Sequence, residues 1–102
     1  MLKTIIEDAR KILTLENVVP LSTLPVVGVE VEEDFGTDGE DALRVWIMIP
    51  DDTPDEAITG QATLDLKYGI RKMLIREGIE LFPYVSLRTE TERKEDLEDR
   101  NA

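Results

Sequence analysis

Apolar residues recur every three or four positions at the start of the chain, between residues 2 and 15. Wound as a helix, they form one stripe that can lie against a core. The spacing therefore predicts a helix over residues 2–15. Residues 17–25 follow with Pro20 and Pro25 among apolar side chains. This mixture predicts an ordered but irregular connector that covers one edge of the core.

The next segments alternate apolar and polar residues with the period of two that is typical of β-strands. This pattern predicts a first strand over residues 26–33. Residues 43–49 carry apolar groups on both faces, which indicates a central strand. Residues 34–41 contain two glycines and several aspartates, so we expect them to form a hairpin loop between the two strands.

A second, longer helix is predicted over residues 53–77. Thr53 and Glu56 have the spacing of a capping box, in which each side chain accepts a hydrogen bond from the other residue's backbone amide. Gly78 can adopt the left-handed conformation that ends a helix. The helix has a first apolar stripe suited to the sheet and a second that needs the first helix, the connector or another subunit. The residues of this second stripe are Ala57, Leu64, Tyr68 and Ile75.

Residues 79–87 predict a third strand, and Pro83 places it at an edge of the sheet because proline has no amide to donate to a neighbour. A hairpin makes the first two strands antiparallel, and a right-handed crossover through the second helix returns the third strand parallel to the second. The predicted fold class is α+β, in the order α-β-β-α-β. It has a small mixed three-stranded sheet, in the order 1-2-3, with two helices packed on it.

This order of elements resembles that of the cytoplasmic domain of cation-efflux transporters and of other small metallochaperone-like folds. The resemblance covers element order and implies a metallochaperone-like topology. The histidine-rich metal sites of those domains have no counterpart here, because the chain contains no histidine.

The last residues of the chain differ from the rest in composition. From residue 90 onward Leu97 is the only large apolar side chain, so no apolar face remains to hold this segment on a core. A length of 102 residues suits one core. We therefore expect a single α+β domain over residues 1–89 and an acidic tail over residues 90–102, either disordered or a frayed helix.

Composition narrows the chemistry that the chain can perform. It contains no cysteine and no histidine, which removes the usual zinc ligands and the commonest general base. No catalytic residue and no cofactor is predicted. No apolar stretch is long enough for a signal peptide or a membrane span, which favours a cytoplasmic location.

The charge balance bears on the choice of partner. The chain has 23 acidic and 12 basic residues, with a formal net charge of −11. Such a surface repels the phosphates of nucleic acids and anionic membranes, so neither is expected as a partner. A protein partner is favoured, either a second copy or a basic protein.

Two groups of carboxylates are candidates for a hard-cation site. One lies in the expected hairpin loop, where Asp34 and Asp38 stand at the first and fifth positions of an EF-hand loop. Gly36 and Val45 occupy positions where that motif needs ligands, so a solvated loop is favoured. The other group precedes the second helix, where negative charge complements the helix dipole. The candidate metal ligands are Asp34, Asp38, Asp41, Asp51 and Asp52.

The most informative side chains lie on the second and third strands. Their alternation places Trp46, Met48, Phe82 and Tyr84 together on the face away from Val45. If both helices cover the opposite face, this surface is exposed, as is typical of an interface. If the helices divide between the two faces, it is core. The interface candidates are Trp46, Met48, Phe82 and Tyr84 on the strands and Leu64, Tyr68 and Ile75 on the second helix.

These observations favour a non-enzymatic interaction or regulatory module that acts through protein contact. It is expected to act as a homodimer or as the partner of another small protein. One alternative is a divalent-cation-responsive module that uses the loop carboxylates. A second is a carboxylate-dependent enzyme whose pocket the sequence does not reveal.

Overall fold

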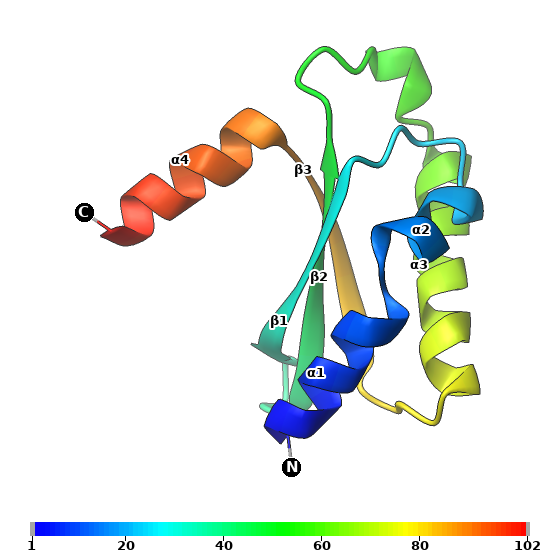
Figure 1. Cartoon of the computed structure of the whole chain (residues 1–102), viewed down its shortest axis with the longest axis vertical. Coiled ribbons are helices and arrows are strands. Elements are labelled where there is room, and N and C mark those ends of the chain that lie inside the picture. Colours follow the sequence, from blue (N-terminus) through cyan, green and yellow to red (C-terminus); the bar gives the residue numbers. More distant parts are fainter. Residues whose placement is uncertain (1, 102) are drawn as a thin grey trace.

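A computed structural model describes residues 2–101 of the chain, in which helices lie on both sides of a three-stranded sheet (Figure 1). The predicted α+β class is confirmed. Short 3-10 turns occur at Val19–Leu21 and Asp55–Ala57. The helices and strands are α1 (Leu2–Ile12), α2 (Leu15–Val18), β1 (Gly28–Phe35), β2 (Asp41–Ile49), α3 (Gly60–Arg76), β3 (Phe82–Thr89) and α4 (Glu90–Asn101).

The sheet has the predicted order, β1-β2-β3, with β2 in the centre. β1 pairs antiparallel with β2, and β3 pairs parallel with β2. In this register Val45 of β2 lies opposite Val31 of β1 and Val85 of β3. Pro83 lies in β3, which is an edge strand as predicted. β3 pairs with β2 alone among the described strands, so a proline, which has no amide hydrogen, is tolerated there.

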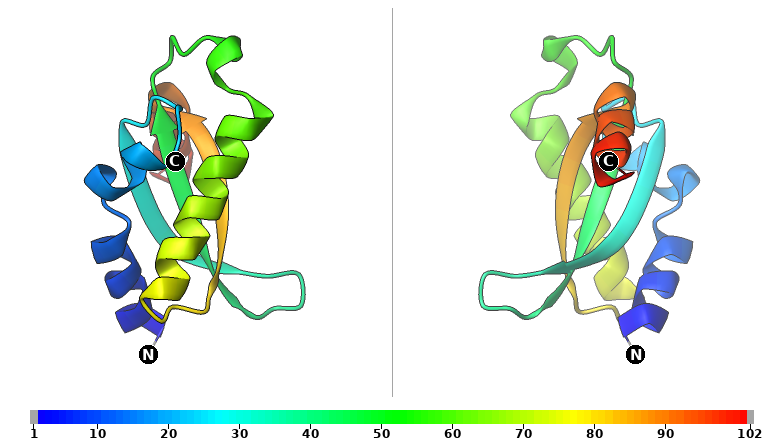
Figure 2. Two further views of the ribbon diagram at one scale, coloured as in Figure 1. Left: turned by 90° about the vertical axis from the view of Figure 1, so that its right-hand side faces the viewer. Right: turned by 90° about the vertical axis from the view of Figure 1, so that its left-hand side faces the viewer.

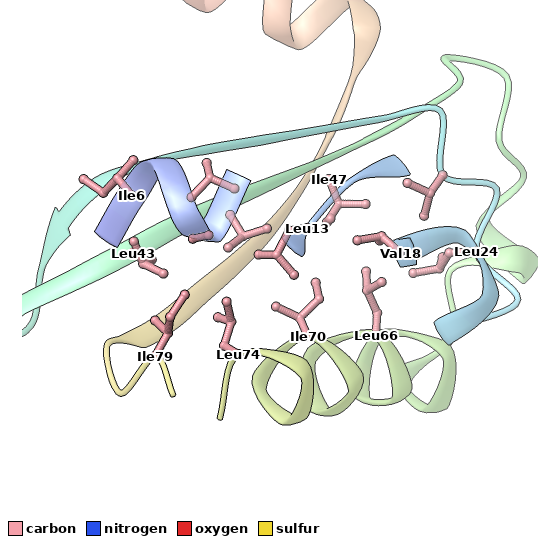
Figure 3. Close-up of a cluster of buried hydrophobic side chains, with 14 of the residues drawn as sticks. Ile6, Leu13, Val18, Leu24, Leu43, Ile47, Leu66, Ile70, Leu74 and Ile79 are labelled. Carbon is pink, nitrogen blue, oxygen red and sulfur yellow. The ribbon is translucent and has the colours of Figure 1, made fainter. Parts of the chain in front are cut away.

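The hydrophobic core lies between the sheet and three helices on one of its faces (Figures 2 and 3). Leu43, Val45 and Ile47 point from β2 into this core and are fully buried. They meet Ile6 of α1, Leu13 just after α1, Val18 of α2, and Leu66, Ile70 and Leu74 of α3. α1, α2 and α3 therefore cover the same face of the sheet. The two predicted helices are not divided between its faces.

The connector between α1 and β1 packs closely on α3. A Cβ atom at Gly69 of α3 would lie 2.8 Å from the Cδ2 atom of Leu21. This glycine therefore marks a close approach of the two segments. The Ser22 hydroxyl also donates a hydrogen bond of 2.6 Å to the carbonyl of Ala62 in α3. The connector is ordered, as predicted, but the first helix ends at Ile12 rather than at residue 15, and the segment includes the short helix α2 rather than being irregular throughout.

Helix α3 begins later than predicted. Thr59 caps it, because its hydroxyl accepts a hydrogen bond of 3.0 Å from the Ala62 amide. The hydroxyl of Thr53 instead donates to the carbonyl of Pro50. The predicted start at residue 53 is therefore wrong, because the successive Ile58, Thr59 and Gly60 disfavour continuous helix and Thr59 is itself a cap residue.

The end of α3 agrees with the prediction. Gly78 has a φ angle of +80° and follows the last helical turn. α3 is the longest described helix, with 17 residues. Within residues 2–101, no helix combines the length and apolar character needed to cross a bilayer.

The acidic segment after β3 is the helix α4, on the sheet face opposite the core (Figure 1). Its start has a capping box: the Thr89 amide donates to the Glu92 carboxylate, and the Glu92 amide donates to the Thr89 hydroxyl. The Thr91 amide and hydroxyl both donate to Asp51. The segment is therefore helical, while its expected fraying and the division at residue 89 stay predictions.

Candidate functional site

The sheet face opposite the core has a row of charged and aromatic side chains. The register places Glu32 of β1 beside Arg44 of β2, and Arg44 beside Tyr84 of β3. Because side chains alternate along a strand, the predicted grouping of Trp46, Met48, Phe82 and Tyr84 on one face is confirmed. The larger side chains of this face are Glu30, Glu32 and Asp34 on β1, Arg44, Trp46 and Met48 on β2, and Phe82, Tyr84, Ser86 and Arg88 on β3.

Arg44 joins all three strands of this face. Its Nε and Nη2 atoms lie 2.9 and 2.8 Å from Oδ2 of Asp34, and its Nη1 donates to the Ser86 hydroxyl at 2.7 Å. Its guanidinium carbon lies 5.7 Å from the ring centroid of Trp46 and 5.5 Å from that of Tyr84. The cation therefore holds two aromatic side chains that were predicted as interface residues.

A second guanidinium, that of Arg88, is almost completely buried between Trp46 and α4. Its Nη1 contacts Asp96 of α4 at 3.1 Å, and its Nη2 contacts Glu30 at 3.3 Å. Arg93 of α4 also donates to Glu30. The hydrogen bond from Arg93, with the charges of Arg93 and Arg88, holds the pKa of Glu30 below its ordinary value despite partial burial.

These contacts cover much of the predicted sheet interface. Met48 is only 6% exposed, and it lines a hollow between the sheet and α4 together with Leu97. Trp46 is half-buried, and its Nε1 donates to Glu32 at 2.8 Å. This part of the face therefore presents little free apolar surface.

A groove between α3 and β3 collects the exposed interface candidates instead. Leu64, Tyr68 and Phe82 are 61, 72 and 44% exposed. The groove encloses about 360 Å³. We call it the α3–β3 groove. Its lining consists of Leu64, Lys67, Tyr68 and Arg71 of α3, Arg44 of β2, and Phe82, Pro83, Tyr84 and Val85 of β3.

The α3–β3 groove runs along the edge of β3. Successive strand residues point to opposite faces, so a groove that contacts Phe82 through Val85 in succession lies beside the backbone. No further strand pairs with the outer side of β3 among residues 2–101. Arg71 and Phe82 also line an adjoining hollow of about 230 Å³ that reaches Ile75. Ile75 therefore extends the apolar lining, while Ala57 lies outside α3.

The charged side chains that line the α3–β3 groove itself are cationic, and the adjoining hollow adds the carboxylate of Glu80. Arg44 is paired with Asp34. Lys67 and Arg71 form no ion pair within the described part of the chain, and the Arg71 guanidinium carbon lies 4.8 Å from the ring centroid of Phe82. In a chain with a net charge of −11, the groove is therefore a locally basic surface.

The opposite edge of the sheet is protected. The Nε atom of Arg10, in α1, donates a hydrogen bond of 3.0 Å to the carbonyl of Val31 in β1. β1 also carries Glu30, Glu32, Glu33 and Asp34. Charged side chains along an edge strand oppose the addition of another strand. β3 has neither this bond nor a series of carboxylates. Pro83 leaves its edge without one amide donor, so the two edges differ in degree, and β3 is the more accessible of the two.

The candidate metal ligands do not gather at one place. Asp34 pairs with Arg44, whereas Asp51 accepts hydrogen bonds from Thr91, which hold the pKa of Asp51 below its ordinary value. Asp38, Asp41 and Asp52 are exposed. Residues 2–101 contain no cluster of three or more acidic side chains arranged to hold a metal ion.

Comparison of the chain with known protein families, with curated proteins and with solved structures finds no match. Function is therefore inferred from the geometry described above.

Proposed function

We propose that the protein is a non-enzymatic interaction module that binds another polypeptide in the α3–β3 groove. The observation that carries the proposal is the open edge of β3 beside the exposed apolar side chains of α3. An edge strand supplies backbone hydrogen bonds to an added strand, and neighbouring pockets select its side chains.

The exposed apolar residues support a binding role. Leu64 and Tyr68 are four positions apart and lie on the same side of α3, next to Phe82 of β3. Leu64, Tyr68 and Phe82 are not part of the hydrophobic core cluster. Large apolar side chains that gather at the surface are typical of interaction sites.

The lining favours binding over catalysis. It has no carboxylate, histidine or thiol, and these groups supply most general acids, general bases and nucleophiles.

The cation-responsive and enzymatic alternatives stay predictions, as does the metallochaperone-like topology. Thermal unfolding with and without calcium or magnesium separates the first alternative from an interaction module, because a bound cation raises the melting temperature.

A homodimer through the sheet face is less favoured than binding in the groove. Met48 is covered by α4, and Trp46 is held between two guanidinium groups. A partner at that face would have to displace these contacts. We therefore propose the α3–β3 groove as the contact surface and keep the homodimer as a prediction for measurement of molecular mass.

Selection from a random-peptide phage library tests the proposal. The wild-type chain should enrich peptides that also bind a Gln61→Glu variant but do not bind a Tyr68→Glu variant. Both substitutions add one negative charge to an exposed position of α3, and only Tyr68 lines the groove. Circular dichroism would verify that both variants are folded. Failure to enrich any peptide, or equal binding to both variants, would overturn the proposal.

A further inference from the structure

We infer that the α3–β3 groove takes an extended peptide segment in which acidic and apolar side chains alternate, an inference that rests on the proposed function. The reason is charge complementarity. Lys67 and Arg71 line the groove and have no carboxylate partner within residues 2–101. An acidic side chain in the groove would supply that partner.

The spacing of the two cations fits an added strand. Lys67 and Arg71 are four residues apart on α3, which corresponds to a rise of about 6 Å. Side chains on one face of a β-strand are separated by two residues, or about 6.7 Å. Acidic residues at positions i and i+2 of a bound segment therefore match the separation of Lys67 and Arg71.

The intervening positions of the segment face different chemistry. Side chains of a strand alternate between its two faces, so residues between the acidic positions point away from α3. On that side the groove offers the ring of Tyr84. The ring of Phe82, with its centroid 5.0 Å away, lies at the start of β3, where it also contacts the guanidinium of Arg71. Apolar side chains at these positions would cover the exposed part of Tyr84.

A second copy of the chain fits this groove less well than an acidic segment does. A two-fold contact brings the same patch of both molecules together, so Lys67 and Arg71 would approach their own copies. Like charges facing each other oppose association. The acidic surface elsewhere on the chain is separate from this groove. It is therefore still free to bind a basic protein, the partner that the net charge favours.

The test uses acetylated and amidated peptides of about eight residues, the length of an ordinary strand. The first alternates Val and Asp, the second alternates Val and Lys, and the third has the composition of the first with its Val and Asp residues in two blocks. Binding to the wild-type chain is followed by fluorescence anisotropy of a dye on each peptide. The alternating acidic peptide should bind at least about tenfold more tightly than either of the others.

Matched charge reversals on α3 identify the site. Lys67→Glu/Arg71→Glu should lose binding of the acidic peptide and gain binding of the basic one. Lys72→Glu/Arg76→Glu makes the same change with the same spacing, but neither residue lines the groove, so it should retain most of the affinity. Circular dichroism confirms that each variant is folded before binding is measured.

The outcomes separate the inference from the proposed function. If library peptides bind the groove but lack acidic residues, the inference is wrong and the interaction module stands. The inference is also wrong if both double variants lose the acidic peptide equally, or if the block peptide binds as well as the alternating one. A further outcome is self-association of the wild-type chain that blocks peptide binding and persists in the Lys67→Glu/Arg71→Glu variant. In that case the occupant of the groove is a second copy of the chain, and the inference is wrong.

Discussion

The guanidinium of Arg88 lies over the indole ring of Trp46, with its central carbon 4.2 Å from the ring centroid. Arg88 comes from β3 and Trp46 from β2, and the arginine also contacts Asp96 of α4. Its Nε atom is buried without a hydrogen-bond partner among the described residues. A cation in this position depends on the aromatic face and the two carboxylates around it. Arg88 therefore connects α4 to the sheet.

Replacement of Arg88 should loosen α4. Arg88→Ala removes the contacts with Glu30 and Asp96 and uncovers the ring of Trp46, which should lower the free energy of unfolding by about 1–3 kcal/mol. Arg88→Lys keeps a charge without the forked geometry and should lose less. Urea unfolding followed by the fluorescence of the single tryptophan measures both. An Arg88→Ala variant as stable as the wild type would contradict this role.

The contact between α4 and the sheet should weaken in acid. The pKa of Glu30 is held below its ordinary value, chiefly by the hydrogen bond from Arg93. Such a carboxylate stabilises the fold above its unfolded pKa, and the contribution is lost as the pH falls through the folded value. Protection factors for the amides of α4 should therefore hold down to about pH 5 and fall below about pH 4.

Glu30→Gln provides the control for this pH dependence. The variant should have lower protection in α4 at neutral pH and a smaller decrease on acidification, because the titrating group at position 30 is absent. An equal decrease in the variant would show that titration at position 30 is not the cause.

The cap of α3 predicts a difference between two threonines. Thr59→Ala should lower the free energy of unfolding by about 1 kcal/mol, because the Ala62 amide loses its acceptor. Thr53→Ala removes only a hydroxyl that donates to the Pro50 carbonyl, and it should cost about half as much or less. Chemical denaturation ranks the two variants. The opposite order would place the helix start at Thr53 after all.

Truncation after Thr89 tests the boundary between domain and tail. The shortened chain should still unfold cooperatively, because the core cluster lies within residues 6–79. Its stability should fall by about 1–2 kcal/mol, because Met48 becomes exposed and Arg88 loses Asp96. Urea unfolding and circular dichroism measure both properties. An unfolded truncation product would show that α4 belongs to the folding unit.

Alternation along the strands predicts which side chains share a face, and the expected hairpin and crossover predict the strand order and directions. Matching the core-facing Val45 with Val85 sets the parallel register, and the common face of Trp46 and Tyr84 follows from it. The wheel of the second helix predicts three of the four buried residues of α3, Ala62, Leu66 and Ile70, but it does not single out Leu74. The α3–β3 groove is not predicted, because it depends on where α3 crosses the edge of the sheet. That is a tertiary property, which no local pattern encodes.

The helix starts show a different limitation. The motif sought at Thr53 and Glu56 occurs again at Thr89 and Glu92, where the reciprocal hydrogen bonds form. Local pattern alone does not decide which of the two capping boxes is used. α4 has little apolar surface, and the ion pairs of Arg93 with Glu30 and of Asp96 with Arg88 hold it to the sheet. A prediction based only on buried apolar surface therefore underestimates how well ordered α4 is.

The bond from Arg10 to the Val31 carbonyl has a consequence for aggregation. A sheet with two open edges can be extended from both sides, which allows cross-β assembly to propagate through successive molecules. Here one edge carries this bond and a series of carboxylates, so growth through that side is opposed. A peptide seated on β3 would then fill the remaining open edge. The same event that recruits a partner would leave the molecule without a template for fibril growth.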